Sequence, residues 1–186
     1  MPASDVSAPP KRFFRRFRRD RRGSAAVEFS LIAVPFFALF FAIVETGIVF
    51  FAGQVLETGV QDSGRLIYTN QITNTNTTVA QFKADLCARV SVLLNCTGID
   101  VDVKYYPAGT TITITDPIDG AGNYDTSGLG FTVPPPNSTG TVVVRAFYRW
   151  PLYVTGLGYN IANISRNTVN SKRLLTGLSA FHIEPT

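Results

Sequence analysis

Apolar residues dominate one long stretch near the N-terminus, residues 24–53, and no charged residue interrupts residues 29–44. Thirty residues at about 1.5 Å each form roughly 45 Å of helix, more than the ~30 Å hydrocarbon core of a bilayer requires. Pro35 lies inside this stretch, where a membrane helix tolerates the missing hydrogen bond. The pattern therefore predicts a membrane-spanning helix over residues 24–53.

The helical period continues beyond Gly53, but only one face stays apolar. That face carries Val55, Leu56, Gly59, Val60, Ser63, Leu66 and Ile67, whereas the other carries Gln54, Glu57, Gln61, Asp62 and Arg65. This is the pattern of an amphipathic helix. We predict that residues 54–69 extend the helix out of the membrane and pack their apolar face on a domain formed by residues 70–186.

The rest of the chain predicts a small α+β domain. A polar linker follows at 70–78, and apolar positions at helical spacing predict one additional helix over 79–94 with Thr77 or Thr78 as N-cap. Two-residue alternation predicts antiparallel strands, separated by turn-rich loops, at 99–106, 110–115, 140–150 and 172–183. In the first strand the alternation places four side chains on one face, namely Ile99, Val101, Val103 and Tyr105.

Charge is distributed unevenly and predicts the orientation. Residues 1–10 are rich in Pro, Ala and Ser, and residues 11–22 contain eight of the 17 basic residues against one acid, Asp20. We expect residues 1–23 to be a disordered cytoplasmic leader, because basic residues flanking a span remain in the cytoplasm. The domain then lies in the periplasm, and the chain after Gly23, with 9 basic and 11 acidic residues, predicts no nucleic-acid partner. The Arg-rich run interleaved with Phe could bind nucleic acid, but its position against a membrane span explains it as a topology signal.

Glu28 is unusual because a carboxylate inside a membrane helix needs a partner. It either lies hydrated in the headgroup layer or pairs with an amine. If the chain is cut after Gly23, the new amino group of Ser24 lies four residues before Glu28, on the same helix face. A neighbouring subunit could supply the same amine.

Farther along the helix, small residues suggest close packing with another helix. Ala38 and Ala42 form a small-x-x-x-small pair on the stripe that also holds Glu45, and Gly47 belongs to the same packing segment. Glu45 lies 17 residues after Glu28 and therefore near the far side of the bilayer. It is either hydrated at that interface or in polar contact with a partner helix.

The two cysteines, Cys87 and Cys96, suggest a periplasmic disulfide. A helix intact to Leu94 would hold their Cα atoms more than about 7 Å apart, so the chain must turn back after the helix. Asp116, Asp119, Asn123 and Asp125 could offer oxygen ligands to Ca²⁺, but their spacing does not fit an EF-hand and favours turns. We expect no metal, no cofactor, no catalytic residues and no small-molecule substrate.

The N-terminal pattern resembles a known family. A basic leader, Gly23, a small residue, Glu28 five residues past the Gly and an apolar helix form the pattern of type IV prepilins and pseudopilins. The wider stretch from Gly23 to Arg65 resembles the TadE-like family of minor pseudopilins of the tight-adherence (Tad, or Flp) pilus, and the resemblance covers residues 15–69. The ending Phe181-His-Ile-Glu184-Pro185 is also similar to that of many members.

The resemblance implies cleavage by a prepilin peptidase after Gly23. It also implies partners among the pilins and pseudopilins of one system, a place in the bacterial inner membrane with possible association with the pilus, and a structural, non-enzymatic role in pilus assembly and adherence. The alternative is an uncleaved single-pass anchor that presents a periplasmic partner-binding domain.

Overall fold

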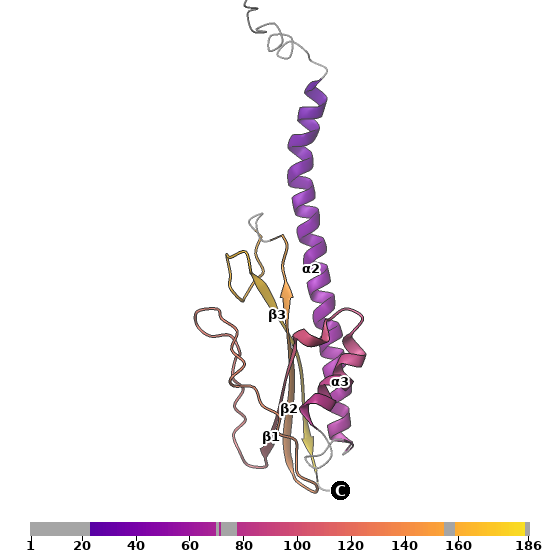
Figure 1. The fold of residues 1–186 in the computed structure, drawn as a ribbon, viewed down its shortest axis with the longest axis vertical. Coiled ribbons are helices and arrows are strands. Elements are labelled where there is room, and N and C mark those ends of the chain that lie inside the picture. The colour runs from indigo at the N-terminus through magenta and orange to yellow at the C-terminus, as the bar shows by residue number, and fades with distance from the viewer. Residues whose placement is uncertain (1–22, 70, 72–77, 155–158, 185–186) are drawn as a thin grey trace, which may run out of the picture. The chain divides into compact units, whose positions relative to one another are not determined.

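The computed structural model describes residues 23–69, 71, 78–154 and 159–184 (Figure 1). Its elements in chain order are α2 (Ser24–Tyr68), α3 (Val79–Val90), the 3-10 turn η2 (Cys96–Gly98), β1 (Ile99–Pro107), β2 (Gly140–Pro151) and β3 (Lys172–Ile183). The predicted α+β class is confirmed. The predicted disordered leader and most of the predicted linker lie outside the described residues.

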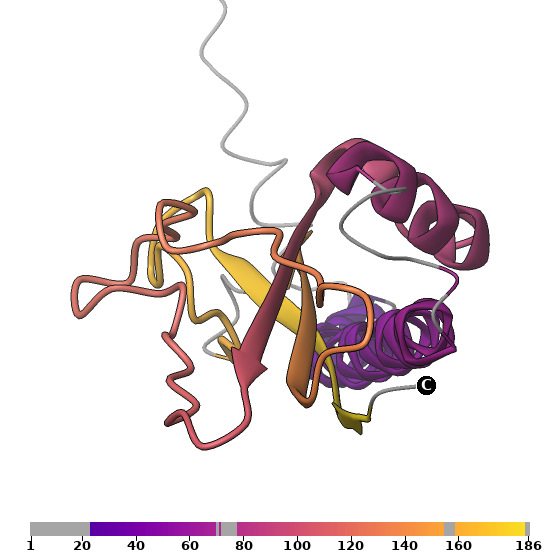
Figure 2. The same cartoon turned by 90° about the horizontal axis from the view of Figure 1, so that it is seen from below.

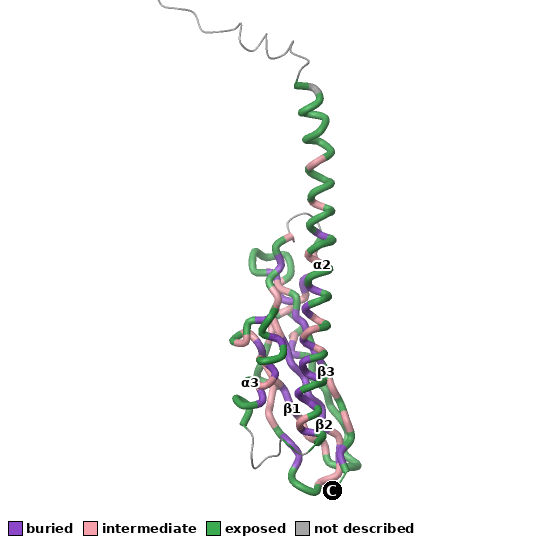
Figure 3. The backbone as a smooth tube through the Cα atoms, turned by 90° about the vertical axis from the view of Figure 1, so that its right-hand side faces the viewer, coloured by how far each residue is buried: buried purple, intermediate pink, exposed green. Residues whose placement is uncertain are grey.

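The chain divides into two compact units, Met1–Phe40 and Phe41–Thr186. Helix α2 begins in the first unit and runs through Pro35 into the second without a break. By length and composition, residues 25–68 of this helix can cross a membrane. The first part of α2 is exposed, whereas buried residues recur along its later turns (Figure 3).

In the second unit, α2 and α3 cover one face of a three-stranded antiparallel sheet in the order β1-β2-β3 (Figure 2). The predicted amphipathic face of α2 is confirmed, because Leu56, Val60 and Ile67 are fully buried. They share one core with α3 and the near face of the sheet, including Phe82, Leu86, Ile99, Val103, Val142 and Val144. Burial of this apolar surface is the main term that holds the helices on the sheet.

A glycine on β3 sets how closely α2 approaches the sheet. A Cβ atom at Gly177 would lie 2.9 Å from both the Leu56 carbonyl oxygen and Val60 Cγ2. Any side chain at position 177 would therefore press against the helix backbone, which cannot move aside as a flexible side chain can.

Helix α3 starts at a capping box, in which Thr78 Oγ1 accepts from the Gln81 amide and the Gln81 side chain accepts from the Thr78 amide. The helix ends at Val90 and not at Leu94 as predicted, and residues 91–94 form a turn that buries Leu94 in the core. This early end brings the Cα atoms of Cys87 and Cys96 to 5.5 Å, and the predicted disulfide is confirmed.

The opposite face of the sheet is covered by residues 108–139, which connect β1 to β2. Polar side chains of β1 hold this connection in place. Asp100 accepts from the Tyr124 hydroxyl at 2.9 Å, Asp102 accepts from the Gly130 amide at 2.8 Å, and Lys104 donates to the Gly128 carbonyl at 2.8 Å. A small apolar cluster of Phe147, Ile164 and Leu174 packs beside them.

The prediction of a strand at residues 110–115 is wrong, since this segment forms no strand and is not part of the sheet. The sheet edge along β1 is partly occupied by a later segment, because Val103 pairs in parallel with Phe131. Side chains hold the 110–115 segment instead. Tyr106 donates its hydroxyl to the Thr113 carbonyl, and Arg145 donates Nη1 to the Thr115 carbonyl.

Asp102 and Arg145 form a buried ion pair between β1 and β2, with Arg145 Nη2 2.6 Å and Nε 2.9 Å from Asp102 Oδ2. We expect Arg145→Met to lower the free energy of unfolding by about 3–5 kcal/mol, because it leaves the buried Asp102 carboxylate with only the longer ion pair to Lys104, at 3.8 Å. Urea unfolding of the detergent-solubilised full chain, followed by circular dichroism, measures this change.

Arg149→Met on the same strand is the matched control, since Arg149 is exposed and lies over the Tyr124 ring. It should cost less than about 1 kcal/mol. Equal losses in the two variants would contradict a special role for the buried pair.

Gly177→Ala tests the contact between β3 and α2. The added methyl group meets helix backbone, so we expect a loss of about 1–3 kcal/mol in the same unfolding assay. Gly53→Ala in α2 is the control, because nothing lies within 4 Å of a Cβ atom at that position. It should stabilise the helix by up to about 1 kcal/mol, and a stabilising Gly177→Ala would refute the close contact.

Candidate functional site along the long helix

The segment predicted to be processed lies at the start of α2. Gly23 is exposed and directly precedes Ser24, the first residue of the helix, and nothing lies within 4 Å of a Cβ atom at Gly23. Glu28 follows Ser24 by four residues in the same helix, so the two lie on one face. The side chain of Glu28 is exposed.

The next turns of α2 expose apolar side chains around the whole helix. Phe29, Leu31, Ile32 and Val34 are all exposed although they point in different directions. Phe36 stacks on Phe40 with their ring centroids 6.4 Å apart. A helix that is apolar on every side and not covered by its own chain fits a lipid environment or a bundle of similar helices.

The four residues predicted to pack against another helix differ in their surroundings. Ala38 is half-buried, Ala42 is buried, and Gly47 is exposed with nothing within 4 Å of a Cβ atom. Within the second unit, the chain's own domain therefore covers the helix face that holds Ala42, while Gly47 points away from it.

Glu45 has a partner that the sequence analysis did not include, since that analysis considered only hydration at the membrane interface or contact with a partner helix. Its carboxylate accepts from the backbone amides of Tyr153, at 2.5 Å, and Val154, at 3.2 Å. One residue later, the Thr46 hydroxyl donates to the Tyr159 hydroxyl at 3.2 Å. These contacts join α2 to the connection between β2 and β3. Sequence could not reveal them, since two of the donors are backbone amides with no residue-specific signal.

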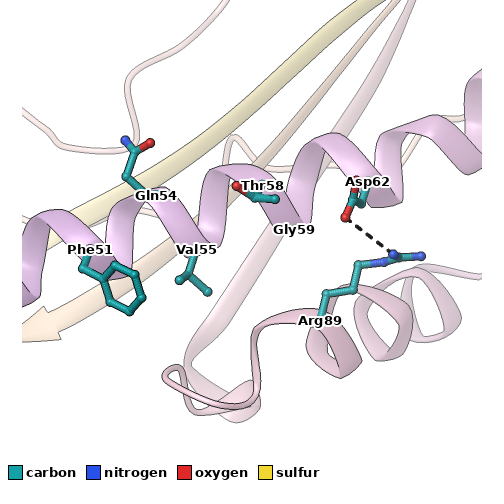
Figure 4. A pocket seen from close by; sticks show the side chains of 7 residues that line it. All are labelled: Phe51, Gln54, Val55, Thr58, Gly59, Asp62 and Arg89. Carbon is teal, nitrogen blue, oxygen red and sulfur yellow. Dashed lines mark ion pairs between the residues drawn. The ribbon is translucent and has the colours of Figure 1, made fainter.

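A groove runs between α2 and α3 (Figure 4), with a volume of about 330 Å³. Phe51 and Val55 form its apolar end. At the other end, Arg89 pairs with Asp85 at 3.1 Å and with Asp62 at 3.8 Å. The hydrogen bond that Arg89 donates to the Asp85 carboxylate raises the pKa of Arg89, so this cation stays charged.

The groove is also where α2 and α3 are joined. Ser63 donates to Asp85 at 2.9 Å, and a Cβ atom at Gly59 would lie 2.5 Å from Val90 Cγ1. The charged side chains of the groove thus bind the two helices to one another. They form no constellation of nucleophile and base.

The acidic loop at 116–125 uses its carboxylates to close turns. Asp116 accepts from the Ile118 amide, and Asp119 accepts from the Ala121 and Asn123 amides. Hydrogen bonds from Asn123 lower the pKa of Asp119, and those from Ser127 lower the pKa of Asp125. Among the described residues, no group of three or more His, Cys, Asp or Glu side chains could hold a metal ion.

The sequence analysis did not single out Tyr124 or the two residues of the buried ion pair, Asp102 and Arg145. Burial, followed by its hydrogen bond to Asp100, raises the pKa of Tyr124, which therefore stays protonated and donates. A signal for the ion pair was present in the sequence. Arg145 interrupts the apolar run of β2, and Asp102 sits on the polar side of the β1 alternation.

Comparison with known proteins bears on the first part of the chain. Residues 23–65 match the family model TadE, described as TadE-like protein. No curated protein and no solved structure matches the chain. The matched range contains Gly23, Glu28 and Glu45, so it covers the segment on which the resemblance rested. TadE-like proteins are a structural and assembly family of the pilus and not an enzyme family. The match to the TadE-like family model over residues 23–65 is consistent with a protein related to the Tad pilus.

Proposed function

We propose that this protein is a minor pseudopilin of a Tad/Flp-type pilus, cleaved by a prepilin peptidase after Gly23 and acting in pilus biogenesis and adherence. One observation carries the proposal: an exposed Gly23 stands directly before a helix that is apolar on all sides, within the range that matches the TadE model. The inner membrane, a cytoplasmic N-terminus and domain boundaries at residues 23, 53 and 69 are part of the same proposal.

Cleavage would change both the charge and the chemistry of the helix start. Hydrolysis of the Gly23–Ser24 bond removes eight basic and two acidic residues and leaves a free amine on Ser24. Loss of the cations releases α2 from its electrostatic attraction to anionic lipid. A positive amine at a helix N-terminus is opposed by the helix dipole, and a carboxylate one turn later offsets this effect.

After cleavage, the exposed apolar surface of α2 would bind the helices of other subunits during assembly. Residues 25–40 expose apolar side chains that can exchange lipid for the apolar helices of pilins or other pseudopilins. Because Ala42 is covered by the chain's own domain, we infer that partner helices approach closely at Ala38 or at Gly47, which lie on opposite faces of α2.

The mature N-terminus tests cleavage. Mass spectrometry of the protein purified from membranes should find Ser24 as the first residue. We expect Gly23→Leu to abolish this processing, because a bulky side chain replaces the small residue before the scissile bond. Gly53→Ala is the control and should be processed normally. A wild-type chain that keeps residues 1–23 would instead favour an uncleaved anchor.

Glu28→Gln tests the pairing of carboxylate and amine. We expect the leader still to be removed, while the amount of protein recovered with the pilus fraction falls roughly tenfold, the effect of losing about 1.4 kcal/mol of pairing. Glu57→Gln, farther along the same helix, should assemble as wild type. Normal assembly of Glu28→Gln would show that the carboxylate needs no amine partner. Adherence to surfaces, measured in parallel, should follow the assembly result.

A further inference from the structure

We propose that the β2–β3 connection is a second membrane contact, docked on anionic phospholipid headgroups where α2 leaves the bilayer. The contact surface is formed by Tyr153, Tyr159, Arg166, Val169, Lys172 and Arg173, and we call it the interfacial surface. It does not depend on cleavage after Gly23, because all its residues lie in the second unit.

Two contacts fix where this surface lies along α2. The Glu45 carboxylate accepts hydrogen bonds from the amides of Tyr153 and Val154, and the Thr46 hydroxyl donates one to the Tyr159 hydroxyl. The other end of the sheet meets the other end of the helix, since the Tyr68 and Phe181 rings lie 5.8 Å apart. Within the second unit, the β2–β3 connection is therefore at the end of the domain that meets Glu45 and Thr46, and Tyr68 lies at the other end (Figure 1).

The sequence of α2 places the edge of the bilayer at this same level. Residues 29–44 carry no charge, and Glu45 is the first charged residue after Glu28. Residues 23–44 of a helix span about 33 Å, close to the ~30 Å of a hydrocarbon core. Beyond Glu45, the exposed Phe50 and Phe51 lie within about 10 Å along the axis, in the range of the headgroup layer.

The side chains of the interfacial surface suit that layer. Tyr153 is 82% exposed, Tyr159 is 44% exposed, and Val169 is fully exposed. Tyrosine is enriched where membrane meets water because its ring is apolar and its hydroxyl is polar. Other large apolar side chains of the domain are exposed as well, such as Val92 and Ile114. Tyr153, Tyr159 and Val169 differ from these because they belong to the connection that contacts Glu45 and Thr46 and that carries exposed cations, a combination that indicates a surface covered in the membrane.

The charge of the connection selects the kind of lipid. No acidic residue occurs between Asp125 and Glu184, whereas Arg166, Lys172 and Arg173 lie in or beside the connection. Arg166 donates to the Asn160 carbonyl at 3.4 Å, and Arg173 donates to the Ile161 carbonyl at 3.1 Å. These bonds hold both exposed guanidinium groups next to the segment that starts at Tyr159. Cations beside exposed tyrosines complement anionic headgroups.

Depth-dependent fluorescence quenching tests the position. The full chain, with its one tryptophan changed by Trp150→Phe, receives Tyr153→Trp and is placed in phosphatidylglycerol nanodiscs whose acyl chains are brominated near the headgroup. We expect at least twofold quenching. Tyr106→Trp, on the strand end paired with Thr141 at the opposite end of the sheet, is the control and should not be quenched. Equal behaviour of the two probes would overturn the proposal.

Hydrogen–deuterium exchange of the unmodified chain tests whether the positive charge of the interfacial surface binds anionic lipid, and it needs no engineered fluorophore. Amides of residues 159–171 should exchange several-fold more slowly in phosphatidylglycerol nanodiscs than in phosphatidylcholine nanodiscs. Arg166→Gln with Arg173→Gln should abolish the difference, whereas Arg65→Gln with Lys83→Gln, cations outside the surface, should preserve it. Protection that is equal in both lipids, or that grows with the number of chains per disc, would assign the surface to a protein contact and overturn the proposal.

Discussion

Helix α2 has to fit two environments, lipid along its early turns and a protein core along its later turns. The rest of this structure follows from that constraint. The early turns of α2 are apolar on every side, as lipid requires, and the later turns keep only one apolar face, as a protein core requires. The change occurs around Ala42 and Glu45. From there the sheet, α3 and the β2–β3 connection cover the face that would otherwise stay exposed, and Gly177 lets β3 approach the helix backbone.

The opposite face of the sheet obeys a different rule. Its long connection, residues 108–139, packs Ile118, Tyr124 and Leu129 on a small apolar cluster, and polar side chains of β1 also position it. The Asp102–Arg145 pair lies at the centre of this arrangement and also reaches the Thr115 carbonyl. Buried ion pairs add little net stability. We infer that this one acts chiefly by specifying where the connection lies.

The proposed role in the pilus rests on surfaces, and no reacting group is needed for it. Among the described carboxylates outside the sheet, Asp119 closes a turn, Asp85 joins α3 to α2, and Glu45 accepts from backbone amides. Glu28 and the Gly23–Ser24 bond remain the places where chemistry would act on the protein. Both lie within the range that matches the TadE-like family model.

The sequence by itself determined the elements whose signal is local. The apolar stretch, the one-sided pattern after Gly53 and the alternation at 99–106, 140–150 and 172–183 each became the predicted helix or strand, because a repeating period is a property of neighbouring residues. The start of α3 at its Thr78 cap could be predicted from the sequence for the same reason.

Only the tertiary structure decided what covers each face. It ended α3 at Val90 so that Leu94 could enter the core, and it left residues 110–115 without a strand partner because a segment at Phe131 pairs with β1. It also gave Glu45 two backbone amides as partners. Alternation shows which way a side chain points, but the group that meets it can come from any part of the chain.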